Sequence, residues 1–457
     1  MIRAALASLL VAGVSGLLDA QDATRPVAGP ERFQMRVVAT GLDAPWEVAW
    51  GPDEQLWVTE RRGRRIVRIN PADGTRRGFT ITEIHQGVAQ DGLLGLAFHP
   101  DLLKGTGSDF VFVAFTYDDA PGTALTPQMA IRRYQYDART RNLANPLDIL
   151  TGLPAHDDHL GGRLAIGPDR RLYLTIGDQG SNFGGNRCNV NRAQQLPTAK
   201  EVESRNWIAY QGKILRIDLD GSIPADNPVL DGVRSHVFTV GHRNPLGLAF
   251  GPAGLLYESE HGPSTDDEVN VIEAGRNYGW PYVAGYRDDK AYVYANWSAS
   301  SPAPCADLPG GEPPASVPRR TESSFTHPQF TAPLQTFFTV DTTAAGSGSA
   351  TIAPGGLEVY AAPGDRGIPG WSNSLLVLGM IRGTVYRLPL SADGRAAAGP
   401  PIELFKAANR YRDLAIAPDG RRIFVVTDPT GTVRVGGGAP APALANPGAL
   451  LEFTYTP

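Results

Sequence analysis

Gly247-Leu248-Ala249-Phe250-Gly251-Pro252, followed by Leu255-Leu256-Tyr257-Glu258, is the stretch that decides the fold, because the chain repeats its pattern. The pattern is a short apolar run, a turn centred on Pro and then a second strand. Six copies align on it, the fifth with a longer turn. The copies are Trp46–Pro52 with Leu56–Glu60, Gly95–Pro100 with Phe110–Ala114, Arg163–Asp169 with Leu172–Thr175, Gly247–Pro252 with Leu255–Glu258, Gly356–Tyr360 with Leu375–Leu378, and Asp413–Gly420 with Ile423–Val426.

Repeated short strands joined by Pro, Asp and Gly turns predict an all-β, six-bladed β-propeller with long inter-strand loops. Most copies are followed by a further strand with a charged start, such as Arg65–Ile69 or Gly212–Ile217. The alternative fold is a sandwich of hairpins that are alike by chance. The copies are unevenly spaced, and the largest excess, about residues 262–355, lies between the fourth and fifth copies. We expect such a long loop to be functional.

The composition is that of a globular protein, with 42% hydrophobic and 19% charged residues. The 52 Gly and 38 Pro favour turns and short strands over helices. A net charge of -5 gives no basic field that would attract nucleic acid.

The N-terminus has the pattern of a secretory signal, with a basic start at Arg3 and an apolar run over Ala4–Leu18. We expect residues 1–23 to be the signal, with an uncertain cleavage site, and residues 33–457 to form the propeller. A membrane anchor is the alternative, but a run of about 15 apolar residues is short for a span, and no later segment is long enough. The predicted location is periplasmic or secreted. Cys188 and Cys305 could pair there, although their spacing leaves the pairing open.

Several loops carry residues suited to chemistry. Ala155–Arg163, just before the third copy, contains His156, Asp157, Asp158 and His159 in a spacing that fits no standard zinc site. A His oriented by a carboxylate is the usual proton acceptor, and Asp178, after the next strand, could be that carboxylate. The alternative for this loop is a solvated turn.

Three further loops hold charged or oxygen-rich side chains. Gly241–Pro245 places an Arg beside an Asn, a pair suited to binding carbonyl or carboxylate oxygens. Glu260–Glu268 and Tyr286–Asp289 offer carboxylates and carbonyls of the kind that Ca²⁺ prefers, without an EF-hand pattern. In Asn409–Asp413 two Arg at alternate positions could grip a polyanion. Taken singly, each of these loops could equally be a solvated surface turn.

The position of these residues is stronger evidence than their type. Polar residues fall directly before the inner strand in copy after copy, and Gln90-Asp91-Gly92 holds this place in the second copy. Such positions meet at one end of a propeller's central channel. The sequence therefore predicts a single site there.

With these motifs in place, the chain resembles the soluble PQQ-dependent glucose dehydrogenases and the related aldose sugar dehydrogenases. The resemblance covers nearly the whole mature chain. It is strongest across Gly161–Asp178, Gly212–Asn227, Gly241–Phe250, Asn277–Asp289 and Asn409–Asp419. It implies a six-bladed propeller, in agreement with the repeat count.

The resemblance also implies roles for particular residues. His159 corresponds to the proton acceptor, Asp178 to the carboxylate that orients it, and Gln90 and Asp158 to substrate contacts, with Gln90 also against the quinone. Arg243 and Asn244 correspond to the pair on the quinone oxygens, and Arg410 and Arg412 to the residues facing the PQQ carboxylates. Gly262 and Pro263 correspond to the carbonyl donors of an active-site Ca²⁺. The ligands implied for two structural Ca²⁺ ions are Glu268, Tyr278, Ala284, Tyr286, Asp288 and Glu322.

The implied reaction is oxidation of the anomeric carbon of an aldose sugar to a lactone. His159 would take the hydroxyl proton as hydride leaves for the quinone, while Ca²⁺ and Arg243 stabilise the charge that develops on the quinone oxygen. The implied partners are a small aldose sugar and a soluble electron acceptor. The sequence leaves the identity of the sugar and of the acceptor open, and a homodimer is one of the assemblies it allows.

Three departures concern the sugar and the cofactor. The family's usual Lys on the fifth blade is replaced by Ile381, next to Arg382. The aromatic substrate loop and cysteine pair of the glucose enzymes fall in Asp341–Ser349, which has neither. A substrate-contacting Gln aligns near Phe183. Glucose specificity is therefore not expected to transfer automatically.

Two other functions compete with this interpretation. A non-catalytic extracellular binding propeller would not need His159, Asp178, Arg243, Asn244, Arg410 and Arg412 together, although Ile381 would suit it. A metal-dependent lactonase propeller would need a carboxylate cluster in the channel rather than paired Arg residues.

Overall fold

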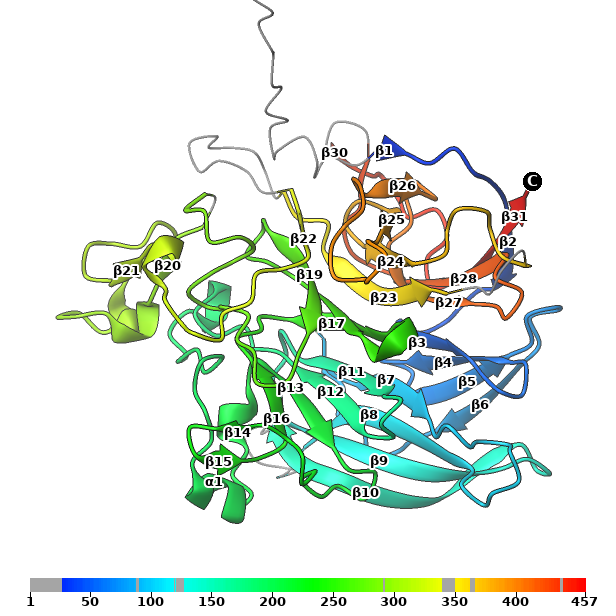
Figure 1. Cartoon of the computed structure of the whole chain (residues 1–457), viewed down its shortest axis with the longest axis horizontal. Helices are drawn as coiled ribbons and strands as arrows, with labels where there is room; N and C mark the ends of the chain where they lie inside the picture. Colours follow the sequence, from blue (N-terminus) through cyan, green and yellow to red (C-terminus); the bar gives the residue numbers. More distant parts are fainter. Residues whose placement is uncertain are drawn as a thin grey trace, which may run out of the picture.

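The protein is described here by a computed structural model covering residues 27–87, 90–118, 120, 127–290, 292–338, 350–361, 366–435 and 439–457. The predicted signal, residues 1–23, and the whole of Asp341–Ser349 lie outside these ranges. Sheets of antiparallel strands repeat around a ring, as Figure 1 shows. The predicted six-bladed β-propeller is confirmed.

Each blade runs from an inner strand at the central channel to an outer strand at the rim. The inner strands are β3 (Pro45–Trp50), β7 (Leu93–Phe98), β11 (Gly161–Ile166), β17 (Pro245–Phe250), β23 (Pro354–Tyr360) and β27 (Tyr411–Ile416). The second strands are β4 (Leu56–Glu60), β8 (Phe110–Asp118), β12 (Leu172–Ile176), β18 (Leu256–Glu260), β24 (Ser374–Gly379) and β28 (Arg422–Thr427). These twelve strands are the six copies seen in the sequence.

The third and outer strands complete the blades. The third strands are β5 (Arg65–Ile69), β9 (Pro127–Asp137), β13 (Lys213–Ile217), β19 (Asp267–Ile272), β25 (Thr384–Pro389) and β31 (Leu450–Thr456). The outer strands are β6 (Arg76–Thr80), β10 (Asn142–Pro154), β16 (Val237–Val240), β22 (Gln335–Phe337), β26 (Ile402–Leu404) and β2 (Arg32–Ala39). In the fifth blade β1 (Val27–Ala28) adds to β26 in parallel.

The ring is closed, which excludes the sandwich alternative. Each inner strand contacts the inner strands of both neighbouring blades, in the order β3, β7, β11, β17, β23, β27 and back to β3. The sixth blade joins both ends of the chain, because β2 pairs with β31 over Arg32–Ala39 (Figure 1). The pairing of the two ends of the chain within one blade therefore closes the ring of blades.

The second strands explain the apolar runs in the sequence. Every residue of β4, β12, β18 and β24 is buried, because each of these strands packs between neighbouring blades on both faces. Their hydrophobic residues form the clusters between blades, such as Trp57 with Val111 and Phe115. Polar residues in these strands are therefore buried as well, which matters for the site.

A β-bulge recurs at the same place in all six blades. The register between the inner and second strands shifts at the beginning of β3, β7, β11, β17, β23 and β27. Bulges bend a strand and re-aim its side chains, and they are frequent beside active sites. Here each bulge lies at the mouth of the channel where the predicted site residues are found.

The remaining elements lie in the loops. They are α1 (Ala199–Glu203) and the short strand pairs β14 (Val229–Leu230) with β15 (Val233–Arg234), β20 (Tyr294–Ala295) with β21 (Arg319–Arg320), and β29 (Arg434–Val435) with β30 (Ala439–Pro440). Short 3₁₀ turns span Gly184–Asn186, Ile208–Tyr210, Pro252–Gly254, Trp297–Ala299, Cys305–Asp307 and Glu322–Ser324. In the described ranges, no helix is long and apolar enough to cross a bilayer.

The long insertion at residues 262–355 supplies β19 and β22 of the fourth blade and an excursion between them. The excursion carries β20 and β21 and projects from the side of the ring at the left of Figure 1. It is tied to the loop after β12 by a disulfide between Cys188 and Cys305, whose Cα atoms are 5.6 Å apart. The pairing left open by the sequence is therefore present.

Candidate active site

A cavity of about 250 Å³ opens at the end of the channel where the inner strands begin. Its lining is mostly polar, and all six blades contribute to it. The fifth blade contributes only Met380. The charged and amide side chains among its lining residues are Arg61, Gln90, Asn244, His261, Arg410, Arg412 and Asp428. The predicted convergence of loop residues at one end of the channel is therefore found.

His159 and Asp178 form the closest acid–base pair at this rim. Nδ1 of His159 lies 2.7 Å from Oδ1 of Asp178, and both side chains are almost completely buried. His159 has a φ of +46°, so the loop turns sharply before β11 and brings the imidazole back over the end of β12. Gly177 allows this approach, because a Cβ there would lie 2.0 Å from the carbonyl oxygen of His159.

Besides His159, Asp178 contacts three hydrogen-bond donors in the described part of the chain. Its carboxylate accepts hydrogen bonds from the backbone N–H of Gly180 at 2.9 Å, Nδ2 of Asn191 at 2.9 Å and Nε1 of Trp280 at 2.7 Å. A carboxylate oxygen accepts hydrogen bonds, so Nδ1 of His159 is the donor in this pair and carries the proton. Nε2 of a neutral His159 is left with its lone pair free to accept a proton.

Nε2 of His159 points towards the predicted substrate contacts. It lies 3.8 Å from Oδ1 of Asp158, and the same Asp158 oxygen accepts a hydrogen bond from Nε2 of Gln90 at 2.5 Å. Gln90 in turn lines the cavity. The structure thus brings together all three residues predicted to contact substrate.

Arg243 and Asn244 lie just before β17, and the carbonyl oxygen of Arg243 accepts a hydrogen bond from the backbone N–H of Asp178 at 2.8 Å. Both are buried, and the guanidinium of Arg243 lies over the rings of Phe183 and Trp280, at 5.1 and 5.3 Å. It donates one hydrogen bond, from Nη1 to the carbonyl oxygen of His261 at 3.2 Å, and its Nε has no partner in the described part of the chain. A buried cation with an unused donor is well placed to bind an anionic or carbonyl oxygen.

Arg410 and Arg412 project together, as their alternate spacing predicted. Both donate to the carboxylate of Asp428, through Nε of Arg410 at 3.1 Å and Nη2 of Arg412 at 2.8 Å. Arg61, which follows β4, lines the same cavity and donates from Nη1 to the carbonyl oxygen of Asp91 at 3.3 Å. Three guanidinium groups therefore surround one end of the cavity.

The pKa values of two of these cations are lowered in the folded protein. Burial, followed by the charge of Arg412, lowers the pKa of Arg61 to about 10, and burial also lowers the pKa of Arg410. Such shifts mean that the folded protein disfavours the cations in the absence of further anions. The end of the cavity is therefore electrostatically suited to a polyanion.

His261 closes the cavity beneath Arg243. Its Nε2 lies 2.8 Å from the carbonyl oxygen of Pro354, and burial, with the charge of Arg243, lowers its pKa well below the usual value. The ring is thus neutral and donates its Nε2 proton to that carbonyl.

The predicted carbonyl donors Gly262 and Pro263 follow His261. The turn is tight, because a Cβ on Gly262 would lie 1.8 Å from the carbonyl oxygen of Thr265. The backbone N–H of Gly262 donates to Oδ1 of Asp267 at 2.9 Å, which fixes the turn next to the cavity. Gly262 and Pro263 have no ligand atom in their side chains, so each could bind an ion only through its backbone carbonyl oxygen.

The residues predicted for structural calcium lie in the insertion. The backbone N–H groups of Gly285 and Ala284 donate to Glu268 and Glu322 at 2.6 and 3.0 Å. Burial, and then the carboxylates of Asp266 and Asp288, raise the pKa of Glu322 to about 8, and burial raises the pKa of Glu268 and Tyr286. Glu268, Ala284, Asp288 and Glu322 are thus neighbours, whereas the ring of Tyr278 packs on His242 at 4.9 Å.

A second buried acidic group lies in the fourth blade. Ligand atoms of His242, Glu258 and Glu260 lie within 4.8 Å of one another. None of the three belongs to the predicted ligand set. His242 already contacts Glu260 at 3.1 Å through Nδ1 and Thr239 at 2.9 Å through Nε2.

Ile381, which stands where the family usually has a Lys, lies in apolar surroundings in the structure. Ile381 packs against the core, and the neighbouring Met380 is the residue that lines the cavity. The guanidinium of Arg382 lies over the ring of Phe338 at 5.0 Å and is absent from the cavity lining. Arg61, from the first blade, does line the cavity.

Sequence reasoning missed Arg61, Asp428, Asn191 and Trp280. Arg61, His261, Met380 and Asp428 each directly follow the second strand of a blade, and all four line the cavity. The repeat therefore predicts these four positions when the residue after each second strand is treated as a site candidate, in the same way as the residue before each first strand. Asn191 and Trp280 lie in long loops and carry no such signal.

Comparisons with known proteins identify the family of the chain. The sequence profile of the family described as "Glucose / Sorbosone dehydrogenase" matches residues 42–302. The chain is 42% identical over 444 residues to quinoprotein glucose dehydrogenase B of Acinetobacter calcoaceticus, covering 94% of this chain and 92% of that protein.

Two more distant relatives have related names. The chain is 28% identical over 262 residues to the aldose sugar dehydrogenase YliI of Escherichia coli, covering 56% of this chain and 63% of that protein. It superposes on the PQQ-bound form of an aldose sugar dehydrogenase from Streptomyces coelicolor with a TM-score of 0.63 and 26% identity, covering 94% of this chain and 100% of the other.

Proposed function

The chain belongs to the glucose/sorbosone dehydrogenase family, and on that basis we propose that it is a PQQ- and calcium-dependent dehydrogenase that oxidises aldose sugars at the anomeric carbon. The observation that carries the proposal is the His159–Asp178 pair next to a cavity lined by the partly buried guanidinium groups of Arg61, Arg410 and Arg412. A hydrolase or a simple binding site needs no such combination.

The cavity fits PQQ, a rigid cofactor with three carboxylates and an ortho-quinone. Arg61, Arg410 and Arg412 would hold its carboxylates, because their three guanidinium groups lie together at one end of the cavity. Arg243, with its unused Nε, and Asn244 would hold the quinone side. PQQ, when bound, is the acceptor of the hydride.

The protein's own residues would supply proton transfer and positioning. Asp178 fixes the proton of His159 on Nδ1, so that Nε2 accepts the proton of the anomeric hydroxyl. Asp158 and Gln90, joined at 2.5 Å, would bind sugar hydroxyls on the same side of the imidazole. Arg243 would stabilise negative charge that develops on the acceptor during the reaction.

The donor sets of the insertion fit calcium. Glu268, Asp288 and Glu322 with backbone carbonyls offer only oxygen ligands, and burial, followed by the charges of Asp266 and Asp288, raises the pKa of Glu322. We assign the structural ions there, with Tyr278, Ala284 and Tyr286 as further ligands, and one ion to the carbonyls of Gly262 and Pro263. The lactonase alternative lacks support, because the channel carboxylates Glu47 and Asp413 are paired with Arg163.

We also propose export to the periplasm or beyond, directed by residues 1–23. The Cys188–Cys305 disulfide supports it, because such bonds persist in oxidising compartments.

The decisive experiment reconstitutes apo-protein with PQQ and Ca²⁺ and measures dye reduction with a panel of aldoses. We expect turnover with at least one aldose, and a His159→Ala variant that keeps its PQQ affinity but loses about 10²–10⁴-fold in kcat. His156→Ala is the matched control, because His156 lies in the same loop and pairs with Asp157 instead. Tight PQQ binding without turnover on any aldose would leave the non-catalytic binding propeller as the better reading.

A further inference from the structure

The loop after β12 places an aromatic ring beside the proposed proton acceptor. The side chain of Phe183 is 46% exposed, yet its ring lies nearly parallel to the imidazole of His159, with the centroids 6.2 Å apart and an interplanar angle of 24°. The same ring lies 5.1 Å from the guanidinium of Arg243. Exposed aromatic residues are common on protein surfaces, but this one borders the two residues assigned to proton transfer and to the acceptor.

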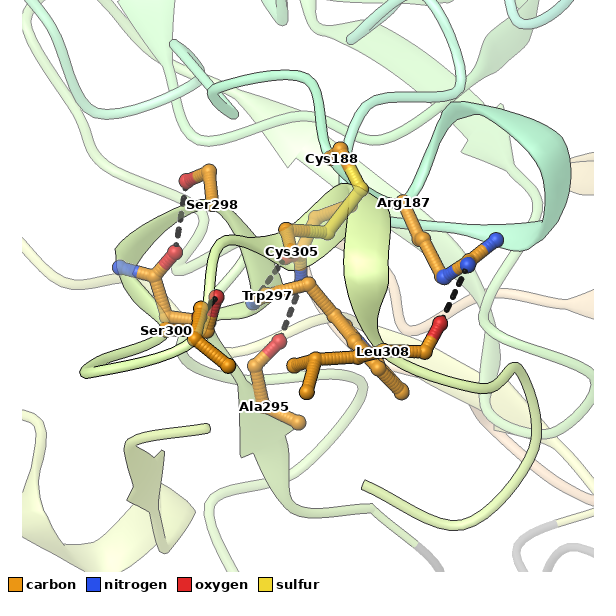
Figure 2. Close-up of a disulfide and its surroundings, with 11 residues drawn as sticks. Arg187, Cys188, Ala295, Trp297, Ser298, Ser300, Cys305 and Leu308 are labelled. Atoms are coloured by element: carbon orange, nitrogen blue, oxygen red, sulfur yellow. Dashed lines mark hydrogen bonds between the residues drawn. A yellow bond between two sulfur atoms is a disulfide. The ribbon is translucent and has the colours of Figure 1, made fainter. Parts of the chain in front are cut away.

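The loop that carries Phe183 is held rigidly in place. Asn182 donates from Nδ2 to the carbonyl oxygen of Ala295 at 2.6 Å and accepts from the backbone N–H of Trp297 at 2.9 Å. The Cys188–Cys305 disulfide fixes the other side of the 3₁₀ turn to the excursion, as Figure 2 shows. Little conformational entropy would therefore be lost when a ligand packs against Phe183.

Two further contacts secure this loop. The guanidinium of Arg187 donates to the carbonyl oxygen of Leu308 at 2.9 Å, which Figure 2 also draws, and lies over the ring of Trp297 at 5.6 Å. Asn191, at the end of the loop, donates to Asp178. The loop is thus joined both to the excursion and to the acid–base pair.

We propose that Phe183 determines sugar specificity, its ring forming an apolar platform on which the C–H face of the reacting pyranose packs. This inference rests on the proposed sugar dehydrogenase function. Pyranoses with equatorial hydroxyls expose axial C–H bonds on their faces, and an aromatic ring binds such a face through its large apolar area. Aldopyranoses with equatorial hydroxyls are therefore the substrate class that fits.

The platform sets what the site can distinguish. A wall that donates and accepts no hydrogen bonds does not strongly penalise a missing hydroxyl, whereas a site that binds each hydroxyl does. Gln90 and Asp158 can read only the hydroxyls within their reach. The enzyme is therefore expected to oxidise several equatorial aldoses and to discriminate against sugars with an axial hydroxyl on the face towards Phe183.

The test compares Phe183→Ala and Phe183→Tyr with the wild-type holoenzyme. We expect KM for equatorial aldoses to rise roughly two- to tenfold in Phe183→Ala, with kcat nearly unchanged, and to recover in Phe183→Tyr, which keeps the ring. Val190→Ala is the matched control, because Val190 is in the same loop, is 54% exposed and should leave KM unchanged. Titration of each apo-variant with PQQ should give one common affinity.

Three results would overturn the inference. KM that stays at the wild-type value in Phe183→Ala would remove the platform. A loss of PQQ affinity with unchanged KM would show that Phe183 serves Arg243 instead. A fall in kcat alone would assign the ring to the orientation of His159. Failure of the proposed function is distinguishable from all three, because the wild-type enzyme itself would then oxidise no aldose.

Discussion

Trp280 links the two halves of the proposed site through a single side chain. Its indole N–H donates to Oδ2 of Asp178 at 2.7 Å, while its ring lies 5.3 Å from the guanidinium of Arg243. The indole is nearly buried and packs on Tyr292. Trp280 therefore positions the carboxylate that orients His159 and supports the Arg assigned to the acceptor.

Replacing Trp280 by Phe separates these two contacts. The Phe ring still packs under Arg243, but Asp178 loses one of its donors, so His159 is held less firmly. We expect kcat to fall roughly tenfold, in the range seen when the hydrogen-bond partner of a functional group is removed, with sugar KM and PQQ affinity nearly unchanged. Steady-state kinetics and PQQ titration measure both. Tyr292→Phe, which loses only a hydrogen bond to the Pro281 carbonyl, is the control.

Replacing Arg61 is expected to weaken the binding of PQQ without lowering the stability of the apo-protein. Burial and the nearby Arg412 lower its pKa to about 10, so its charge disfavours the empty cavity and favours a bound polyanion. We expect Arg61→Met to weaken PQQ binding about 10- to 100-fold while leaving Tm of the apo-protein unchanged or higher. Fluorescence titration and calorimetry test this. Arg62→Met, in an exposed pair with Asp43, should change neither, and an unaltered PQQ affinity in Arg61→Met would contradict the assignment.

The residues that the sequence could predict are those tied to the repeat. His159, Asp178, Asn244, Arg410 and Arg412 stand next to the first or second strand of a copy, so a correct repeat places them at one rim. Side-chain orientation within the rim depends on the bulges and on residues with positive φ such as His159, which no periodicity reveals. Trp280 reaches Asp178 across 102 positions of sequence, so only the folded insertion brings them together.

The loop between β12 and β13 is the element that carries the proposed sugar platform. It carries Phe183, Cys188 and Asn191, and within it the described helical elements are only the 3₁₀ turn Gly184–Asn186, α1 and Ile208–Tyr210. Its order therefore comes from cross-links to the excursion rather than from regular structure of its own. The sequence indicated that the long insertion would be functional, but which loop it would support could not be derived from spacing.

Removing the disulfide tests this dependence. Cys188 and Cys305 are separated by 117 positions, and closing a loop of that size stabilises the folded state by up to about 4–5 kcal/mol in the chain-entropy view. We expect a Cys188→Ser/Cys305→Ser variant to melt roughly 5–15 °C lower and to show a higher sugar KM. PQQ affinity should be retained, because Arg61, Arg410 and Arg412 belong to other blades. Equal Tm and KM in the variant and the wild-type protein would mean that the hydrogen bonds of Asn182 and Arg187 suffice.

The whole ring is joined at its centre by one ionic network. Arg163 of β11 binds Asp413 of β27 at 2.9 and 3.1 Å and donates from Nε to the carbonyl oxygen of Leu246 in β17. Asp413 also accepts from the backbone of Val48 in β3, and Glu47 accepts from the backbone of Leu96 in β7. Five blades are thereby hydrogen-bonded to one group of charges, and Glu358 of β23 brings in the fifth blade electrostatically. The network holds together the blades whose ends form the proposed cofactor cavity.

Glu358 makes the stability of this centre depend on pH. Burial, followed by the charge of Asp413, raises its pKa from 4.5 to about 8. The folded protein then keeps a proton that the unfolded chain releases above pH 4.5, so the contribution of Glu358 to stability is complete at acidic pH. That contribution is lost as the pH rises towards about 8. The raised pKa means that Glu358 is a neutral carboxyl in the folded protein below about pH 8. A Gln side chain has the same shape and no charge, so it should behave like this neutral carboxyl at every pH.

We therefore expect Glu358→Gln to flatten the pH profile of thermal unfolding. Between about pH 5 and pH 8 the Tm of the wild-type apo-protein should fall by up to roughly 7–14 °C more than that of the variant, because a pKa raised from 4.5 to about 8 corresponds to about 3–4 kcal/mol over this range. Scanning calorimetry across this range measures the difference. Glu403→Gln, at an exposed pair with Lys406, is the control and should follow the wild-type profile. Parallel wild-type and Glu358→Gln profiles would mean that Arg163 keeps Glu358 ionised, and that the central network is charged throughout the working range of the protein.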